Sequence, residues 1–519
     1  MSTLLASINL VRAGFVLARE HALALVEKDR LPAPARFALS LARLIERRGG
    51  KPGLAAALTK LGPSYVKLGQ FLATRPDVVG MAVARDLETL QDRMPPFGLA
   101  IARTEIAREL GGTVEQHFAS LSEPIAAASV AQVHKARVED AKGARDVAVK
   151  VLRPGVERRF RRDLDTFYFA ARAIERIDPK SKRLRPVEIV ETLERTTAFE
   201  MDLRLEAAAL SEMAQNTRSD PGFRVPKPDW ERTARNILTL EWIDGIPLSD
   251  VEAIRAAGHD LVALGATVIQ SFLRHAIRDG FFHADMHQGN LFVDREGRLV
   301  AVDFGIMGRA GEKERRFLAE ILHGFITRDY RRVAEVHFEA GYVPARHSVA
   351  DFAQAIRAIG EPIHEKRADE ISMAKLLTLL FEVTELFDMK TRPELILLQK
   401  TMVVVEGVAR TLDPKLDMWK TAEPVVRDWI ERRFGPAGFV RDAGQEVVRA
   451  AKALGQLPDM LARAETLAAN VEQASERGFS LAPETVRAIG RAEGRGNRWL
   501  ALGIWALVAF MVGWRFGWW

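Results

Sequence analysis

The sequence contains no cysteine among its 519 residues. Disulfide bonds, thiolate nucleophiles and cysteine-based zinc or iron–sulfur sites are therefore excluded. No secretory signal opens the chain, and there is neither an internal repeat nor a low-complexity tract. Positive charge is in small excess, because 75 lysines and arginines face 69 aspartates and glutamates, a net charge of +6. Over this length, so small an excess favours an anionic membrane surface, and we expect no nucleic-acid partner.

An uncharged stretch, Trp499–Trp514, lies near the carboxyl end. It is slightly shorter than the ~20 apolar residues that cross a bilayer, but tryptophans at both of its ends suit the two membrane interfaces. Three arginines precede it, so the positive-inside rule places the main body in the cytoplasm. We expect a membrane helix over 499–519. The alternative is a helix that lies on the membrane surface or against the protein.

Sheet-forming patterns occupy only part of the chain. Alternation predicts two strands, Ile125–Val138 and Asp146–Leu152, joined by a polar turn. A helical stretch follows from Val156 to Asn216, and a strand is expected at Asn236–Trp242. The later helices are interrupted by a strand-rich patch between His283 and Gly305.

A small sheet-containing lobe followed by a larger helical lobe is the outline of a protein kinase. We therefore predict an α+β, protein-kinase-like two-lobed fold that is mostly helical, with an N-terminal helical extension and a C-terminal membrane helix. The predicted divisions are the extension (1–120), the N-lobe (121–248), the helical C-lobe (249–435), a charged helical tether (436–498) and the membrane-anchoring helix (499–519).

Two residues of opposite charge match the phosphate-holding pair of kinases. Lys150 ends the alternating strand Val147-Ala148-Val149-Lys150, and kinases hold an ammonium near the α- and β-phosphates in this way. Glu206 is placed on a predicted helix, from which a carboxylate can hold Lys150 by a charge-assisted contact. Taken alone, Lys150 is better explained as an edge-strand lysine and Glu206 as part of a solvated acidic face.

The strongest motif is His283-Ala284-Asp285-Met286-His287-Gln288-Gly289-Asn290. Its spacing from Asp to Asn equals that of the kinase catalytic loop, H-R-D-L-x-x-x-N. Asp285 is then expected to accept a proton or orient the acceptor, and the amide oxygen of Asn290 to ligate Mg²⁺. A transition-metal site at the two histidines is the weaker alternative, because no third ligand of a suitable type is nearby.

The D-F-G element of kinases follows at Asp303-Phe304-Gly305, where Asp303 is expected to bridge the metal and the phosphates. Since these signals occur in the order in which a kinase presents them, we predict a site for ATP and Mg²⁺. The backbone of Glu241 and Ile243 is expected to pair with adenine. The expected nucleotide-covering loop comprises Ala126, Ala127, Ala128, Ser129 and Val130.

Two departures separate this chain from an ordinary protein kinase. The glycine-rich loop G-x-G-x-x-G is absent before Lys150, and alanines take its place. Alanine has less backbone freedom than glycine, so the contacts of this loop with the nucleotide should differ from those in protein kinases. No A-P-E element follows Asp303, so the usual peptide-docking segment is not evident. Both departures disfavour a protein substrate.

With these motifs in place, the chain resembles the UbiB family of atypical kinase-like proteins, also called the ADCK family, over about residues 50–415. Tyr65–Gln70 matches the family's K-x-G-Q signature, and the alanine-rich loop also matches. Glu200-Met201-Asp202 matches its E-x-D element. The catalytic loop looks like the family's H-A-D-P-H-P-G-N, with Met286 and Gln288 in place of both prolines.

The resemblance implies an extension that folds over the site where a protein substrate would sit. Lys67 and Gln70 are then expected to meet Glu200 and Asp202, with Lys67 close to the phosphates. Similar members assist ubiquinone synthesis at a bacterial inner membrane and show ATPase activity instead of protein phosphorylation. They are thought to act on isoprenoid phenol lipid intermediates or on the biosynthetic complex.

We therefore expect an atypical kinase or ATPase at the bacterial inner membrane, with its main body facing the cytoplasm and ubiquinone biosynthesis proteins as partners. The expected catalytic residues are Lys67, Lys150 and Asp285, the metal ligands Asn290 and Asp303, and the regulatory residues Gln70, Glu200 and Asp202. A protein kinase acting on a biosynthetic partner and an inert nucleotide-binding scaffold are the alternatives. Pairing of two copies as a homodimer stays open.

Overall fold

The structure is a computed structural model. It describes residues 3–20, 22, 53–73, 79–80, 83, 86–87, 89–90, 94–177, 185–363, 382–384, 386–389 and 393–434. The chain divides into a unit spanning Met1–Glu431 and a second unit, of which only the first three residues are described. The predicted tether (436–498) and membrane helix (499–519) lie outside the described residues. Among the residues that are described, no helix has the length and apolar character needed to span a membrane.

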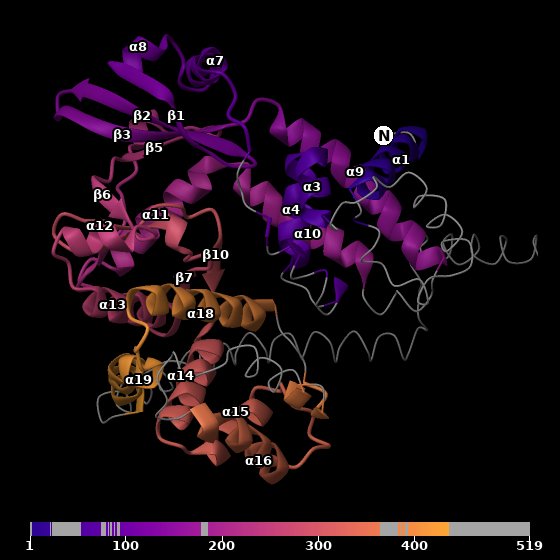
Figure 1. Cartoon of the computed structure of the whole chain (residues 1–519), viewed down its shortest axis with the longest axis vertical. Helices are drawn as coiled ribbons and strands as arrows, with labels where there is room; N and C mark the ends of the chain where they lie inside the picture. The colour runs from indigo at the N-terminus through magenta and orange to yellow at the C-terminus, as the bar shows by residue number, and fades with distance from the viewer. Residues whose placement is uncertain are drawn as a thin grey trace, which may run out of the picture. The chain divides into compact units, whose positions relative to one another are not determined.

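Helices of the N-terminal extension pack on one another and on a long helix that follows the first sheet (Figure 1). They are α1 (Thr3–Arg19), α3 (Leu54–Leu61) and α4 (Pro63–Ala73). Leu58, Leu61 and Val66 form their shared core. Two further helices, α7 (Leu99–Leu110) and α8 (Val114–His117), lie over one face of the sheet.

The first sheet has four antiparallel strands in the order β1-β2-β3-β5. Their bounds are Ser120–Ala127, Ala131–Asp140, Gly143–Leu152 and Ile237–Glu241. The prediction of one strand over Ile125–Val138 is therefore wrong, because a hairpin turn at Ala128–Val130 separates β1 from β2. The turn has no glycine or asparagine to mark it. The predicted strand at Asn236–Trp242 is confirmed by β5.

Alternation along β3 decides which side chains face the site. Val147, Val149 and Val151 are fully buried beneath α7, where they pack with Ile106. Because successive strand residues point to opposite faces, Lys150 is directed away from this core. The opposite face of β3 is thus left for chemistry.

Three helices, and not one continuous element, occupy the stretch from Val156 to Asn216. They are α9 (Val156–Ile177), α10 (Pro186–Glu200) and α11 (Leu203–Asn216). Asp202 caps α11, because its carboxylate accepts a hydrogen bond from the Arg204 N–H at 3.2 Å. The buried stripe of α11 includes Leu203, Leu210 and also the charged Glu206.

The C-lobe surrounds the largest hydrophobic core. A second sheet runs in the order β4-β9-β8-β6, and a strand pair joins β7 to β10. These strands are β4 (Phe223–Arg224), β6 (Gly245–Pro247), β7 (Phe281–His283), β8 (Leu291–Asp294), β9 (Leu299–Ala301) and β10 (Met307–Arg309). The strand-rich patch predicted between His283 and Gly305 is confirmed.

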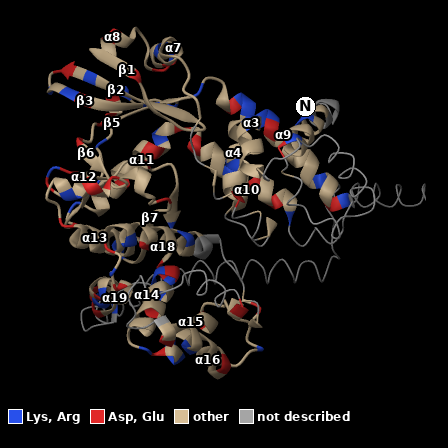
Figure 2. Ribbon diagram, in the orientation of Figure 1, with Lys and Arg blue, Asp and Glu red and all other residues tan. Residues whose placement is uncertain are grey.

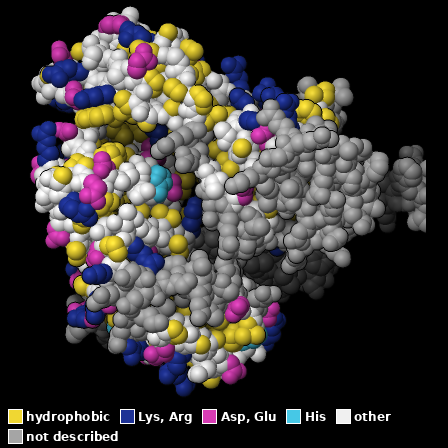
Figure 3. Space-filling model, in the orientation of Figure 1, with side chains coloured by type: hydrophobic (Ala, Val, Ile, Leu, Met, Phe, Trp, Pro, Cys, Tyr) yellow, Lys and Arg dark blue, Asp and Glu magenta, His cyan; other side chains and the backbone are white. Residues whose placement is uncertain are grey.

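Helices complete this lobe, and α13 and α18 run side by side (Figure 1). The helices are α12 (Val251–Ala256), α13 (Leu261–Leu273), α14 (Glu312–Ile326), α15 (Tyr330–Glu339), α16 (Val349–Gly360), α18 (Pro393–Leu412) and α19 (Met418–Phe434). The described helices carry charges of both signs (Figure 2). On the face drawn in Figure 3, charges of both signs are interspersed with hydrophobic side chains.

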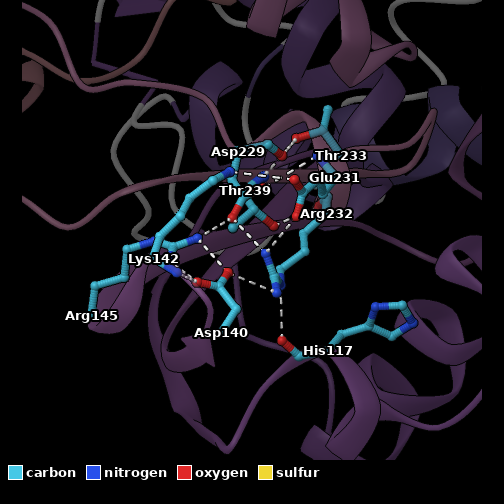
Figure 4. A network of polar contacts seen from close by, with 9 residues as sticks. All are labelled: His117, Asp140, Lys142, Arg145, Asp229, Glu231, Arg232, Thr233 and Thr239. Carbon is cyan, nitrogen blue, oxygen red and sulfur yellow. Dashed lines mark hydrogen bonds and ion pairs between the residues drawn. The ribbon is translucent and has the colours of Figure 1, made fainter.

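A polar network ties the β2–β3 hairpin to the segment before β5 (Figure 4). The Arg145 guanidinium donates to Asp140 at 2.8 Å and to Asp229 at 2.9 Å. Arg232 donates to Asp229 at 2.9 Å and to the His117 carbonyl at 3.0 Å. The network joins β2, β3 and α8 to the segment before β5.

Candidate functional site

Lys150, Glu206 and Asp303 meet on the free face of β3. The Lys150 ammonium lies 2.9 Å from each Glu206 oxygen and 3.2 Å from Asp303 Oδ2. The side chains of Lys150 and Glu206 are 15% and 6% exposed, whereas that of Asp303 is 44% exposed. Glu206 also accepts a hydrogen bond from the Phe304 N–H at 3.3 Å. One ammonium therefore joins the sheet, α11 and the loop after β9.

Burial and the neighbouring charges shift the pKa values of all three groups in this triad. Burial lowers the pKa of Lys150, but the carboxylates of Asp303 and Glu206 outweigh that effect and raise the pKa. Burial favours the neutral form of Asp303, yet the ammonium of Lys150 and the N–H of Gly305 together hold its pKa well below the usual range. Burial raises the pKa of Glu206 in spite of Lys150. An ionised, partly exposed Asp303 beside a fixed cation is ready to receive a metal ion.

The loop after β7 is held by its own backbone and side chains. The Asp285 N–H donates to His283 Nδ1 at 3.0 Å, and the Asn290 amide donates to the Asp285 carbonyl at 3.2 Å. The Val302 N–H donates to the Asn290 carbonyl at 3.0 Å. Since Val302 precedes Asp303, this bond couples the two loops that carry Asn290 and Asp303. Thr401 of α18 anchors the same loop through the Ala284 carbonyl, at 3.1 Å.

His283 supports the loop as a neutral ring. It is 2% exposed and lies 5.1 Å from the Phe304 ring. Burial lowers its pKa to about 4, although Asp303 and Asp285 act in the opposite direction. His287 is exposed at 50% and lies 3.7 Å from the Asp285 carboxylate. In the part of the chain that is described, no group of three His, Cys, Asp or Glu side chains is placed to hold a metal.

The donors near Asp303 suit Mg²⁺. The Asn290 side chain gives its NH₂ group to the Asp285 carbonyl, which leaves its amide oxygen for a ligand. Carboxylate and amide oxygens are hard donors, and Mg²⁺ usually takes only one or two protein ligands beside phosphate oxygens and waters. Asn290 and Asp303 therefore fit the ion that the sequence predicts.

The alanine-rich loop turns back on itself above Lys150. The last β1–β2 pair is Ala127 with Gln132, and the Ala128 N–H donates to the Ala131 carbonyl at 2.8 Å. None of the residues from Ala126 to Val130 has a positive φ. The register pairs Val133 with Lys150, so the turn lies a few residues beyond the ammonium along the same hairpin.

The predicted adenine-pairing segment begins where β5 ends. The Glu241 N–H donates to the Lys227 carbonyl at 2.9 Å, and its carboxylate accepts from Arg224 at 3.0 Å. The Trp242 N–H donates to the Asp146 carbonyl at 3.4 Å. Of this segment's backbone N–H groups, those of Glu241 and Trp242 are thus engaged within the protein. Ile243 lies in the connection between β5 and β6.

The extension contacts the kinase-like part through one expected ion pair. The Lys67 ammonium of α4 lies 2.7 Å from Glu200 at the end of α10, and both side chains are nearly buried, at 12% and 9% exposed. Asp202 binds the Arg204 guanidinium at 2.6 Å. Gln70 is partly exposed on α4. Of the four residues expected to meet, the structure therefore shows Lys67 and Glu200 in contact.

Sequence reasoning missed the residues that hold the loops by their backbones. Arg153 donates to the Ala128 carbonyl from Nε at 3.0 Å and from a terminal nitrogen at 2.9 Å. Gln132, fully buried on β2, exchanges two hydrogen bonds with the Phe97 backbone. A glutamine at the start of β2 and an arginine directly after the apolar end of β3 were the available signals. Neither matches a kinase motif.

A two-lobed arrangement with a lysine–glutamate pair, an Asp-x₄-Asn loop and a D-F-G aspartate defines a kinase-like protein. Comparison with known proteins agrees. The ABC1 atypical kinase-like domain matches residues 89–337, and the UbiB helical domain matches residues 356–417.

Curated relatives are similar over most of their length. A "Probable protein kinase UbiB" of Marinobacter nauticus is 40% identical over 83% of this chain and 80% of its own. The protein of that name from Pseudomonas paraeruginosa is 41% identical over 76% of this chain and 74% of its own. The one from Aeromonas hydrophila is 38% identical over 92% and 87%. The chain belongs to the UbiB family of atypical kinase-like proteins.

Proposed function

We propose that this protein is an atypical kinase or ATPase that binds Mg-ATP and supports ubiquinone biosynthesis. The observation that carries the proposal is the convergence of Lys150, Glu206 and Asp303, because this is how kinases hold a metal-bound triphosphate. Membership of the UbiB family supports the metabolic role.

Each side chain has a part in this proposal. Asn290 and Asp303 would hold Mg²⁺, which supplies positive charge to the phosphates when it is bound. Lys150, fixed by Glu206, would contact the α- and β-phosphates. Asp285 would orient a water molecule or an acceptor hydroxyl by accepting its hydrogen bond. Lys67 would add a second ammonium beside the phosphates. In the structure, Glu200 binds this ammonium.

The acceptor and the place of action belong to the same proposal. We infer an anchor in a bacterial inner membrane, with the main body in the cytoplasm, from the uncharged stretch Trp499–Trp514 and the arginines before it. Isoprenoid phenol lipids, or proteins of the biosynthetic complex, would then be within reach. The buried Lys67–Glu200 pair supports a small-molecule acceptor, since it ties the extension to α10, the helix directly before the one that carries Glu206.

A protein kinase is the second candidate, and the curated names of the relatives favour it. The complete Asp285–Asn290 loop is compatible with either acceptor. The two functions differ in one observable. Transfer of labelled phosphate to a partner protein, lost in Asp285→Asn, would establish the kinase, whereas phosphate release stimulated by phenol-like lipids supports the ATPase.

The gene should be deleted in its own host and quinones extracted from the membranes. We expect ubiquinone to fall and an earlier isoprenoid intermediate to accumulate. Wild-type protein should restore the quinone. The Asp303→Asn variant, expressed to the same level, should not. Normal ubiquinone in the deletion strain would refute the metabolic role. Full rescue by Asp303→Asn would refute the role of the metal site.

A further inference from the structure

The alanine-rich turn is held from outside by one guanidinium. Arg153 comes directly after β3, and its backbone N–H donates to the Val130 carbonyl at 2.8 Å. Its side chain donates twice to the Ala128 carbonyl, at 3.0 and 2.9 Å. The same residue therefore binds the first and the last residue of the turn at Ala128–Val130.

A second segment is clamped to the same place. A terminal nitrogen of Arg153 also donates to the Pro95 carbonyl at 2.9 Å, and the guanidinium lies 5.7 Å from the centre of the Phe97 ring. The Met94 N–H donates to the Ala127 carbonyl at 3.4 Å. We call Met94–Phe97 the strap. It forms the last described part of the chain before α7.

Gln132 fixes the strap from the sheet side. Its amide oxygen accepts from the Phe97 N–H at 2.9 Å, and its amide nitrogen donates to the Phe97 carbonyl at 3.1 Å. The side chain is fully buried, so neither bond competes with water. With the strap fixed at Phe97, Pro95 and Ala128 offer Arg153 two carbonyls in a constant arrangement.

We call these contacts of Arg153 and Gln132 the clamp. A glycine-rich loop fits its backbone to the phosphates by being flexible, whereas the clamp holds this loop in one shape. Glycine lets a loop adjust its backbone to the phosphates, whereas alanines in ordinary backbone conformations do not. A loop that cannot adjust must already have the right shape, because ordering it on binding would weaken affinity. Guanidinium suits this task, since its fixed fork of donors reaches several carbonyls at once.

We propose that Arg153 is a positioning residue for the nucleotide, which holds the Ala126–Val130 loop and the strap in one conformation over the phosphates. The inference rests on the proposed binding of Mg-ATP and extends it to a residue that contacts no nucleotide itself. The proposal assigns to Arg153 the shape of the loop over the phosphates and gives it no role in binding the base.

Three full-length variants test this proposal. Arg153→Met keeps the length of the side chain but removes all of its donors, and Arg153→Lys keeps the charge but loses the fork. Arg137→Met is the matched control, because Arg137 lies on β2 of the same sheet, is half exposed and forms ion pairs with Glu139 and Asp146. Hydrogen exchange without nucleotide reports on the loop, and calorimetric titration reports on binding.

We expect Arg153→Met to speed amide exchange over 126–133 by about tenfold, a local opening that leaves the midpoint of thermal unfolding nearly unchanged. Mg-ATP affinity should fall by about tenfold, which is about 1.4 kcal/mol. Adenosine affinity should stay the same, because that ligand has no phosphates. Arg153→Lys should lie between, and Arg137→Met should match wild type.

Unchanged exchange over 126–133 in Arg153→Met would overturn the clamp, whatever happens to binding. Faster exchange with equal losses for adenosine and Mg-ATP would overturn the positioning role and leave only a structural one. If wild-type protein binds no Mg-ATP, the proposed function fails. The exchange result then still decides whether Arg153 holds the loop.

Discussion

The Lys150–Glu206 ion pair allows a prediction that depends on the third member of the triad. Both side chains are nearly buried, and the ammonium lies 2.9 Å from the Glu206 oxygens. Removing one partner of such a pair costs about 3–5 kcal/mol, because the other charge is left buried alone. The loss of stability should differ between removal of Lys150 and removal of Glu206. Asp303 lies 3.2 Å from Lys150, so it still pairs with the ammonium when Glu206 is neutral.

We therefore expect Lys150→Met to destabilise the protein more than Glu206→Gln does. Lys150→Met leaves the Glu206 carboxylate buried without a cation, at a cost of about 3–5 kcal/mol. Glu206→Gln keeps an oxygen for the Phe304 N–H and leaves the ammonium with Asp303, so about 1–2 kcal/mol is expected. At no more than about 2 °C per kcal/mol for a unit of this size, the unfolding midpoint should fall by roughly 6 °C and roughly 2 °C respectively.

Calorimetric or dye-monitored unfolding at pH 7 without nucleotide measures both shifts. Lys135→Met is the matched control, because Lys135 is a partly exposed lysine on β2 that pairs with Asp146 at 2.8 Å and lies 4.7 Å from the centre of the Trp242 ring. Its midpoint should move by less than about 2 °C, as expected for a surface ion pair. A drop for Glu206→Gln as large as that for Lys150→Met would refute the reasoning. So would shifts for both that are no larger than the control's.

Two further predictions concern the extension and the C-lobe. Lys67→Met should leave Glu200 buried without its cation, so amide exchange in α4 and α10 should become faster. Mass spectrometry measures this exchange. Unchanged rates would show that the ion pair does not hold the two helices together. Burial lowers the pKa of His337 from the ordinary 6.5, so the unfolded chain binds the proton more readily and stability falls as the pH drops below about 6.5. His337→Leu should lose less of its stability between pH 7 and pH 5 than wild type, and parallel losses in urea titrations would contradict this.

The sequence alone was sufficient to predict the residues that meet by regular geometry. Period-two alternation in β3 predicts that Lys150 points away from Val147 and Val149, and the burial pattern of the strand confirms this. Glu206 falls on the same helical face as Leu203 and Leu210, which accounts for its burial beside Lys150. Here local periodicity and the order of the motifs carry enough information.

Other features depend on contacts that no spacing encodes. The predicted strand ran through the β1–β2 turn because Ala128–Val130 has no glycine, asparagine or aspartate, the residues that most often mark a two-residue hairpin turn. Arg153 and Gln132 bind backbone atoms of the strap, and any sequence offers such atoms. Asp202 was expected to meet Lys67 and Gln70, and the structure adds a contact that the motifs do not encode, an ion pair with Arg204 two residues along the chain.

The most direct test of the account is calorimetric titration of Mg-ATP into wild-type protein and Asp303→Asn. Asp244→Asn serves as the control, since Asp244 is an exposed aspartate that pairs with Arg295. We predict that Asp303→Asn weakens Mg-ATP binding by more than about tenfold, because it removes the charge of a metal ligand, and that Asp244→Asn binds as wild type does. Equal affinity in all three proteins would contradict a magnesium–nucleotide site at Asp303.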